Sequence, residues 1–255
     1  MLTENMSEFF FDYDLNSKLP VRYPSIPLTI IALYVLFVKW IGPSWMKDRE
    51  PFKLRRVMIV YNFILSMANI YFSISLIILM IQNRDLMCLN EENRFHSSRM
   101  ENTVRIRWHA FLERFCTLFD TIFLVLRKKD SHVSILHVFH HVIVCLLCTL
   151  LINAEDLGFF VALVFAINST VHVIMHFYYG LAAFGPSMRK YLWWKKYLTL
   201  LQIGQFVFAL LYMFITMSTG CEERSLRNIV FVSFCLALLV LFINFYHKGY
   251  SRKKD

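Results

Sequence analysis

Long apolar runs, separated by short polar segments, cover most of the chain between residues 26 and 246. The runs are about 17–25 residues long and do not alternate between apolar and polar positions, which indicates helices rather than strands. A helix of about 20 residues crosses the hydrocarbon core of a bilayer. The pattern predicts seven membrane-spanning helices, at residues 26–42, 57–81, 105–126, 132–153, 157–181, 197–218 and 228–246.

Two of the seven segments contain residues that are unusual in a membrane-spanning helix. The first is expected to close at Gly42 and Pro43, because proline cannot continue a regular helix. The third is the least apolar, since it carries Arg114 and Asp120.

Composition supports a membrane protein of helices. Hydrophobic residues make up 57% of the chain and the mean hydropathy is +0.49. The 7 glycines and 6 prolines are too few for the turns of a many-stranded barrel. We therefore predict an all-α, polytopic protein of one domain, with seven transmembrane helices bundled around a central apolar cavity. Residues 1–25 form a polar tail, 26–247 the membrane domain and 248–255 a basic tail.

The net charge of +9 does not indicate nucleic acid, because the Lys and Arg residues lie in short loops and no soluble basic module carries them. The lipid bilayer is the expected partner. Most of these cations fall on the side that holds the C-terminus, so the positive-inside rule places that end in the cytosol. The N-terminus then lies outside or in a lumen, and Asn5 begins a glycosylation sequon there.

The same topology makes a prediction for the 6 cysteines. Only Cys88 and Cys221 fall in loops, and both loops lie on the oxidising, luminal side. We predict a disulfide between them, with the four cysteines of the spans reduced. Two separated free thiols are the alternative, because loop positions permit a bond without enforcing it.

Histidines mark the candidate site. His137, His140 and His141 share one face of the fourth span, and His172 and His176 lie on the fifth. A single histidine would read as a core residue, but ionisable groups inside a membrane usually mark a reaction or transport path. In the predicted topology all five lie in cytosolic halves of spans, at one depth with Asp120, Gln202, Gln205 and Asn244. This indicates a reaction centre open to the cytosol above an apolar cavity.

Several motifs resemble those of the ELO family of very-long-chain fatty acid elongases, in order and in register over about residues 40 to 250. They are Gly42-Pro43, Met46, Arg49, Pro51, Leu54 and Tyr61-Asn62; Asp120-Thr121, Phe123 and 125–129; 137–141; Asn168, His172, Met175, Tyr178 and Tyr179; 193–199, Gln202 and Gln205-Phe206; and Asn244-Phe245-Tyr246 with Tyr250.

The resemblance implies condensation of a long-chain acyl-CoA with malonyl-CoA to give 3-oxoacyl-CoA, carbon dioxide and CoA. It implies no cofactor besides these substrates, a central tunnel for the acyl chain, and the endoplasmic reticulum membrane. It also suggests contact with the other enzymes of the elongation cycle and leaves a homo-oligomer open.

For this chemistry we assign His140 or His141 as nucleophile or base, with His137 beside them, and Asn168 and His172 as polarising groups for the acyl carbonyl. Asp120 would orient a histidine, or bond a neighbouring backbone group or tyrosine. The other supporting residues are His176, Tyr179, Gln202 and Gln205, of which the two glutamines could instead be interhelical hydrogen bonds. The CoA phosphates are assigned to Arg127, Lys128, Lys195, Lys196, Asn244 and Lys248.

The chain departs from the family pattern in its third and fifth spans. The family motif Lys-x-x-Glu-x-x-Asp-Thr has Arg114 and Thr117 at its first two places, which leaves Arg114 without its in-motif acidic partner. Glu113 is not expected to substitute for the motif's glutamate at position 117. His176 stands where the family has a tyrosine, and adds a titratable group.

Two other classes of protein remain as alternatives. Histidine boxes also occur in membrane di-iron desaturases and hydroxylases, but those carry about eight histidines, and the five grouped here have only Asp120 as a carboxylate. We therefore predict no metal. A seven-span transporter or receptor would explain intramembrane polar groups but not the spacing of the motifs. Metal content and malonyl-CoA-dependent product formation separate the three.

Overall fold

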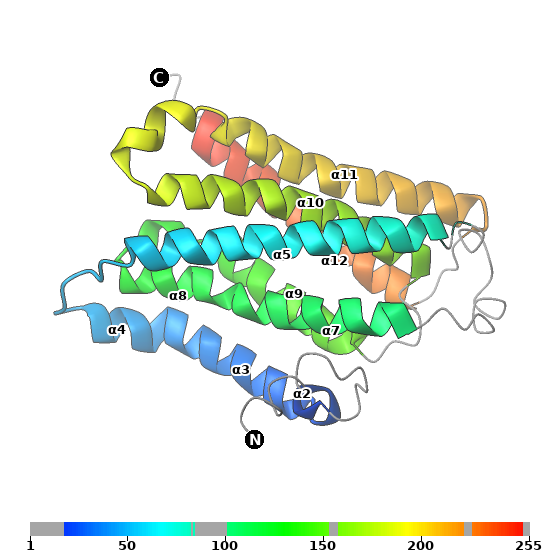
Figure 1. Cartoon of the computed structure of the whole chain (residues 1–255), viewed down its shortest axis with the longest axis horizontal. Coiled ribbons are helices and arrows are strands. Elements are labelled where there is room, and N and C mark those ends of the chain that lie inside the picture. Colours follow the sequence, from blue (N-terminus) through cyan, green and yellow to red (C-terminus); the bar gives the residue numbers. More distant parts are fainter. Residues whose placement is uncertain (1–17, 83, 85–100, 153–157, 222–225, 252–255) are drawn as a thin grey trace. The chain divides into compact units, whose positions relative to one another are not determined.

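The computed structural model describes residues 18–82, 84, 101–152, 158–221 and 226–251, whose regular elements are all helices (Figure 1). The longer helices are α3 (Ser25–Leu36), α5 (Arg55–Gln82), α7 (Glu101–Cys116), α8 (Leu118–Leu126), α9 (Ile135–Leu151), α10 (Gly158–Ala183), α11 (Lys195–Ser218) and α12 (Leu226–Tyr246). The shorter elements are α2 (Leu19–Arg22), α4 (Gly42–Met46), π-helical turns at Phe37–Ile41 and His247–Ser251, and 3₁₀ turns at Asp130–His132 and Pro186–Tyr191.

Five of the described helices are long and apolar enough to cross a membrane: Ser25–Met46, Arg55–Gln82, Phe159–Ala183, Lys195–Ser218 and Asn228–Tyr250. The predicted class, an all-α protein that crosses the membrane several times, is confirmed. The predicted number of seven spans is not confirmed, because two of the predicted segments do not form one long helix. The fourth segment forms the 17-residue α9, about 25 Å long, and the third is divided between α7 and α8.

The prediction that the first span closes at Gly42 and Pro43 is wrong, since the helix continues to Met46. In the π-helical turn before it, the Gly42 N–H donates to the Phe37 carbonyl, five residues back. Pro43 thereby falls in the first turn of α4, where its missing N–H and fixed φ cost little.

The break in the third segment occurs at Thr117. The Thr117 hydroxyl donates to the Arg114 carbonyl over 2.7 Å, and the Asp120 N–H donates to the Thr117 carbonyl, three residues back. A threonine side chain bonded back to its own helix competes with the regular ladder and bends the helix. α7 therefore ends at Cys116 and α8 begins at Leu118.

The chain divides into two compact units. Unit 1 comprises the described residues of Met1–Leu54 and Ser98–Leu157. Its core contains Ile31 and Tyr34 of α3, Val38 of the π-helical turn that follows, Leu118 and Val125 of α8, and Val138 and Cys145 of α9. The Tyr34 hydroxyl lies 2.7 Å from the Thr121 hydroxyl of α8, which satisfies both buried groups.

Unit 2 comprises the described residues of Arg55–Ser97 and Gly158–Asp255, and contains α5, α10, α11 and α12. A polar seam on α5, made of Asn62, Ser66, Asn69 and Ser73, is buried. Ser66 donates to the Val173 carbonyl (3.1 Å), and the Ser73 hydroxyl lies 2.7 Å from that of Thr170, both on α10. Inside a membrane the hydrophobic effect does not drive apolar helices together, because the lipid is equally apolar. Hydrogen bonds such as these therefore fix the register of α5 against α10.

Gly42 offers a test of the first span. A Cβ there would lie 2.8 Å from both the Phe37 carbonyl oxygen and a Val125 methyl carbon. Gly42→Ala is expected to lower the free energy of unfolding by about 1–3 kcal/mol, since overpacking forces the backbone to shift. Gly204→Ala on α11 is the matched control, because a Cβ there meets no atom within 4 Å of the described structure. It should stabilise by up to about 1 kcal/mol through helix propensity. Thermal unfolding in detergent measures both, and equal shifts would contradict the close approach.

Cys221 is disulfide-bonded, whereas Cys116, Cys145, Cys148 and Cys235 form no disulfide. Its predicted partner, Cys88, lies outside the described residues, as does the predicted glycosylation site Asn5. The Cys88–Cys221 pairing stays a prediction.

Candidate functional site

The start of α9 places the first set of histidines. Ser134 is extended and caps the helix, accepting a hydrogen bond from the His137 N–H at 3.2 Å. The helix therefore begins at Ile135 and not at residue 132, because Asp130–His132 forms a separate 3₁₀ turn. His137, His140 and His141 fall in its first two turns.

The three imidazoles of α9 lie against one another, as their spacing predicts. The ring centroids of His137 and His141 are 4.6 Å apart, and those of His140 and His141 are 5.5 Å apart, in both cases edge to face. His141 is buried, and its Nδ1 lies 3.3 Å from the Thr117 hydroxyl. Nε2 of His137 is buried and has no hydrogen-bond partner in the described part of the chain. The three imidazoles of unit 1 thus form one contiguous group.

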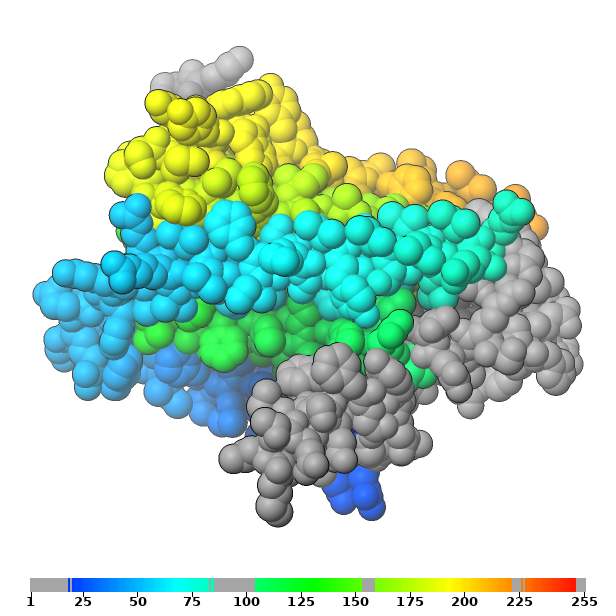
Figure 2. Space-filling view, viewed as in Figure 1, coloured from blue at the N-terminus to red at the C-terminus, as the bar shows by residue number. Residues whose placement is uncertain are grey.

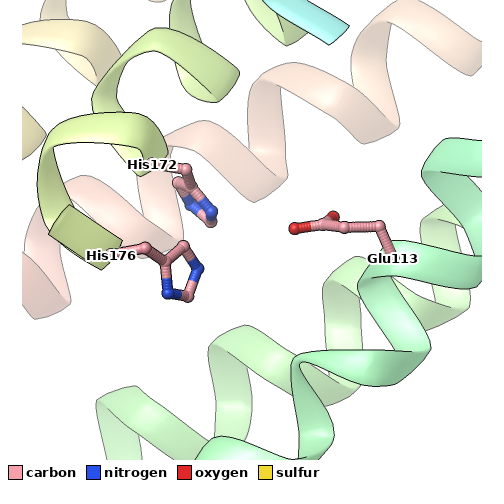
Figure 3. A group of neighbouring side chains, drawn as sticks. All are labelled: Glu113, His172 and His176. Atoms are coloured by element: carbon pink, nitrogen blue, oxygen red, sulfur yellow. The ribbon is translucent and has the colours of Figure 1, made fainter. Parts of the chain in front are cut away.

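The second set belongs to unit 2. His172 and His176 are buried one turn apart on α10, with ring centroids 5.8 Å apart, and their side chains leave the same side of the helix (Figure 3). His176 Nδ1 lies 3.2 Å from Asn62 Oδ1. The Asn62 amide nitrogen donates to the Met58 carbonyl (2.8 Å), so its oxygen is the atom turned to His176.

Predicted polar residues of α10 and α11 also meet. The Asn168 amide donates to Gln205 Oε1 over 3.4 Å, and the Gln202 amide donates to the Met175 sulfur over 3.4 Å. The glutamines thus make interhelical bonds, as their alternative interpretation proposes, and one of those bonds holds Asn168. Tyr179 is exposed, and Asp120 lies half-buried in the first turn of α8 of unit 1.

The residues predicted to bind CoA fall in both units. Lys195, Lys196, Asn244 and Lys248 of unit 2 are exposed, and the Lys196 ammonium lies 5.7 Å from the centre of the Tyr246 ring. In unit 1, Arg127 and Lys128 follow α8.

Lys128 has a structural role of its own. Its ammonium donates to the Lys47 carbonyl (2.9 Å), and its φ of 51° places it in the left-handed region. The Lys128 N–H bonds the Val125 carbonyl and the Lys129 N–H the Leu124 carbonyl, which together form a Schellman cap. A loss of activity on changing Lys128 would therefore not by itself report on CoA.

The expectation that Glu113 does not substitute as the acidic partner of Arg114 is wrong. Arg114 Nε lies 3.2 Å from a carboxylate oxygen of Glu113, and both side chains are buried. Adjacent helical residues do not face each other, but the long arginine side chain reaches its neighbour. Glu113, the third residue drawn in Figure 3, thus has a partner within unit 1.

Sequence reasoning missed Asn62 and Thr117 as partners of histidines. Asn62 carries a recoverable signal, because the polar residues 62, 66, 69 and 73 recur at heptad-like spacing within an apolar span. Thr117 carries none, since a single threonine in an apolar run is ordinary.

The bond between Asn62 and His176 leads to a prediction. Asn mimics the Nδ1 side of histidine, so His176→Asn is expected to keep the contact with Asn62 and to change the apparent melting temperature by less than about 3 °C. Asn62→Leu leaves His176 Nδ1 buried without this acceptor and should destabilise by about 1–3 kcal/mol. Thermal unfolding in detergent measures the stability of both variants. Ser73→Ala, in the same polar seam of α5, is measured beside them. A larger loss for His176→Asn than for Asn62→Leu would contradict the assigned bond.

Comparisons with known proteins agree on one family. The family model described as "ELO: GNS1/SUR4 family" matches residues 19–255. The chain is 38% identical over 239 residues to "Very long chain fatty acid elongase 4" of Homo sapiens, which covers 92% of this chain and 74% of that protein. It is 39% identical to "Very long chain fatty acid elongase 7" of Rattus norvegicus over 89% of this chain and 82% of the relative. It is 34% identical to "Very long chain fatty acid elongase 1" of Homo sapiens over 91% and 83%.

Proposed function

Because the chain belongs to the ELO (GNS1/SUR4) family, we propose that it is an enzyme of fatty acid elongation that condenses an acyl-CoA with malonyl-CoA. The products are 3-oxoacyl-CoA, carbon dioxide and CoA. The observation that carries the chemical proposal is the contact among the three imidazoles of α9, with centroids 4.6 and 5.5 Å apart, in a protein that otherwise buries mostly apolar side chains.

Two roles are open to His140 or His141. As a nucleophile, an imidazole nitrogen bonds to the acyl carbonyl carbon, and CoA leaves as a thiolate that takes a proton from solvent. Loss of carbon dioxide from malonyl-CoA then gives an enolate, whose carbon attacks the acyl group and frees the imidazole. As an acid–base group, the histidine instead protonates the departing thiolate while the enolate attacks the acyl-CoA directly.

The remaining assignments follow from this reaction. Asn168, held by Gln205, and His172 polarise the acyl carbonyl as charge develops on its oxygen. The exposed cations Lys195, Lys196 and Lys248 neutralise CoA phosphates. The acyl chain occupies an apolar tunnel, and each methylene that it buries contributes about 0.8 kcal/mol.

We further propose that the protein acts in the endoplasmic reticulum membrane, with its N-terminus in the lumen and its C-terminus in the cytosol. Other enzymes of the elongation cycle are its expected partners there, and a homo-oligomer remains open. The malonyl-CoA and acyl-CoA substrates suffice for the reaction, without a metal or other cofactor.

The decisive experiment supplies the purified protein with labelled malonyl-CoA and a ladder of acyl-CoAs. Label in a 3-oxoacyl-CoA two carbons longer than the substrate is the expected result, and it should survive chelators. Release of CoA from acyl-CoA alone, together with a histidine peptide heavier by one acyl group, would select the nucleophilic role. Absence of labelled product together with stoichiometric iron would overturn the proposal in favour of a desaturase or hydroxylase.

A further inference from the structure

A groove runs between α5 and α10 of unit 2, two antiparallel helices that lie side by side (Figure 1). Its volume is about 470 Å³, a size at which protein cavities hold small organic ligands. Ile77 and Ile81 line it on the side of α5, and Leu163 and Ala166 on the side of α10. Of the described residues that line the groove, Arg84 alone carries a charge.

The groove is separate from the candidate site of condensation. Leu163, Ala166 and Thr170 line it and recur at helical spacing on one face of α10. Asn168 and His172 each stand two residues from Thr170, which is about 200° around the helix. The two residues proposed to polarise the acyl carbonyl therefore leave the opposite side of α10, and the groove is not part of their site.

The length of the groove matches one leaflet of a bilayer. Near one end, the hydroxyl oxygens of Ser73 and Thr170 lie 2.7 Å apart and bring α5 and α10 together. Phe159, toward the other end, precedes Thr170 by 11 residues, or about 16 Å along a helix. Half of the hydrocarbon core of a bilayer is about 15 Å thick. An acyl chain of one leaflet would therefore run the length of the groove, beside the exposed Ile77 and Ile81.

Arg84 marks the end of the groove at which a lipid head group would lie. α5 ends at Gln82, so Arg84 follows closely after a helix that is apolar and long enough to cross a membrane. Its side chain is exposed, and a guanidinium can donate two hydrogen bonds to one phosphate group. Cations next to the end of a membrane helix attract anionic lipid head groups. Apolar walls with a cation at one end fit a ligand that has an apolar chain and an anionic group.

We infer that the groove between α5 and α10 binds a glycerophospholipid of the bilayer, with one acyl chain in the groove and the phosphodiester group on Arg84. The second acyl chain stays in the surrounding lipid, because the groove is open along Ile77 and Ile81. The bound chain fills the space that the side chains of α5 and α10 leave between the two helices. The inference does not depend on the proposed reaction, since the groove lies outside that site.

Photo-crosslinking tests the site directly. Full-length protein in detergent micelles is irradiated with a phosphatidylcholine that carries a diazirine in one acyl chain, and the labelled peptides are sequenced. We expect label in residues 77–84 and 159–170, with unlabelled dioleoylphosphatidylcholine competing at a lower excess than oleate. Stronger competition by oleate would overturn the inference in favour of a free fatty acid. Label spread evenly over the exposed faces of α11 and α12 would overturn it in favour of nonspecific contact with lipid.

Two variants and two matched controls measure the contribution of each part. Arg84→Gln is expected to raise the probe concentration for half-maximal labelling about fivefold, the effect of one cation near a head group. Ala166→Leu should raise it about tenfold, because the longer side chain displaces about two methylenes of the bound chain.

The controls are Arg56→Gln, at the start of α5, and Ala182→Leu, at the far end of α10; both residues are exposed and outside the groove. They should stay within about twofold of the parent protein. Arg84 lies beyond the end of α5, so Arg84→Gln carries the test if Ala166→Leu lowers the yield of folded protein. Labelling by Arg84→Gln that equals labelling by Arg56→Gln would overturn the inference.

Discussion

Alanine at His140 or at His172 is expected to abolish formation of 3-oxoacyl-CoA while the protein still folds and inserts. The two residues represent the two sets of histidines, one on α9 of unit 1 and one on α10 of unit 2. Removing a group that transfers a proton or bonds to the substrate costs at least about 10²-fold in rate. Removing a group that polarises the carbonyl costs about 10²–10³-fold.

The measurement is labelled product per molecule of folded protein, at equal amounts of monodisperse protein in detergent. His132→Ala is the matched control, because His132 is exposed, precedes α9 and has its Nδ1 3.2 Å from the hydroxyl of the neighbouring Ser131. It should retain nearly full activity. Near-parental turnover by either His140→Ala or His172→Ala would remove that residue from the mechanism.

Hydropathy was sufficient to predict the class of fold, because a bilayer requires long apolar helices whatever their packing. Five predicted spans reappear with ends shifted by a few residues, as in α5 and α11. The errors have local causes. A π-helical turn carried the first helix past Pro43, and a threonine bonded to its own backbone divided the third segment. Neither feature has a signature in apolar periodicity.

The candidate site likewise has one part that the sequence predicts and one part that it does not. Helical spacing alone brings His137, His140 and His141 into contact, and likewise His172 and His176, since residues three and four apart share a face. The groups that orient them come from other helices: Asn62 lies 114 residues from His176, and Thr117 lies 24 residues from His141. Such pairs depend on packing between helices, which one sequence does not reveal.

Arg114 shows the limit of spacing arguments most clearly. Facing positions on a helix are three or four residues apart and Glu113 is adjacent to Arg114, yet the two side chains form a buried ion pair. An arginine carries its charge at the end of a long flexible stem, so the position of its guanidinium is decided by what it can bond and not by the direction of its Cβ. In an apolar environment a nearby carboxylate is the partner that lowers its energy most.

Glu113→Leu is therefore expected to destabilise the protein by about 3–5 kcal/mol, because it leaves a buried guanidinium without this charge partner. Arg114→Met should cost a similar amount by removing this cation from the buried Glu113 carboxylate. The double variant should recover most of either loss, since a pair of well-packed apolar residues often matches a buried ion pair. Lys129→Gln, which changes an exposed cation after α8, is the control and should stay within about 0.5 kcal/mol. Thermal unfolding of the four variants in one detergent gives the coupling energy directly. Additive losses in the double variant would show that Glu113 and Arg114 act independently, and that their contact contributes little to holding α7 in unit 1.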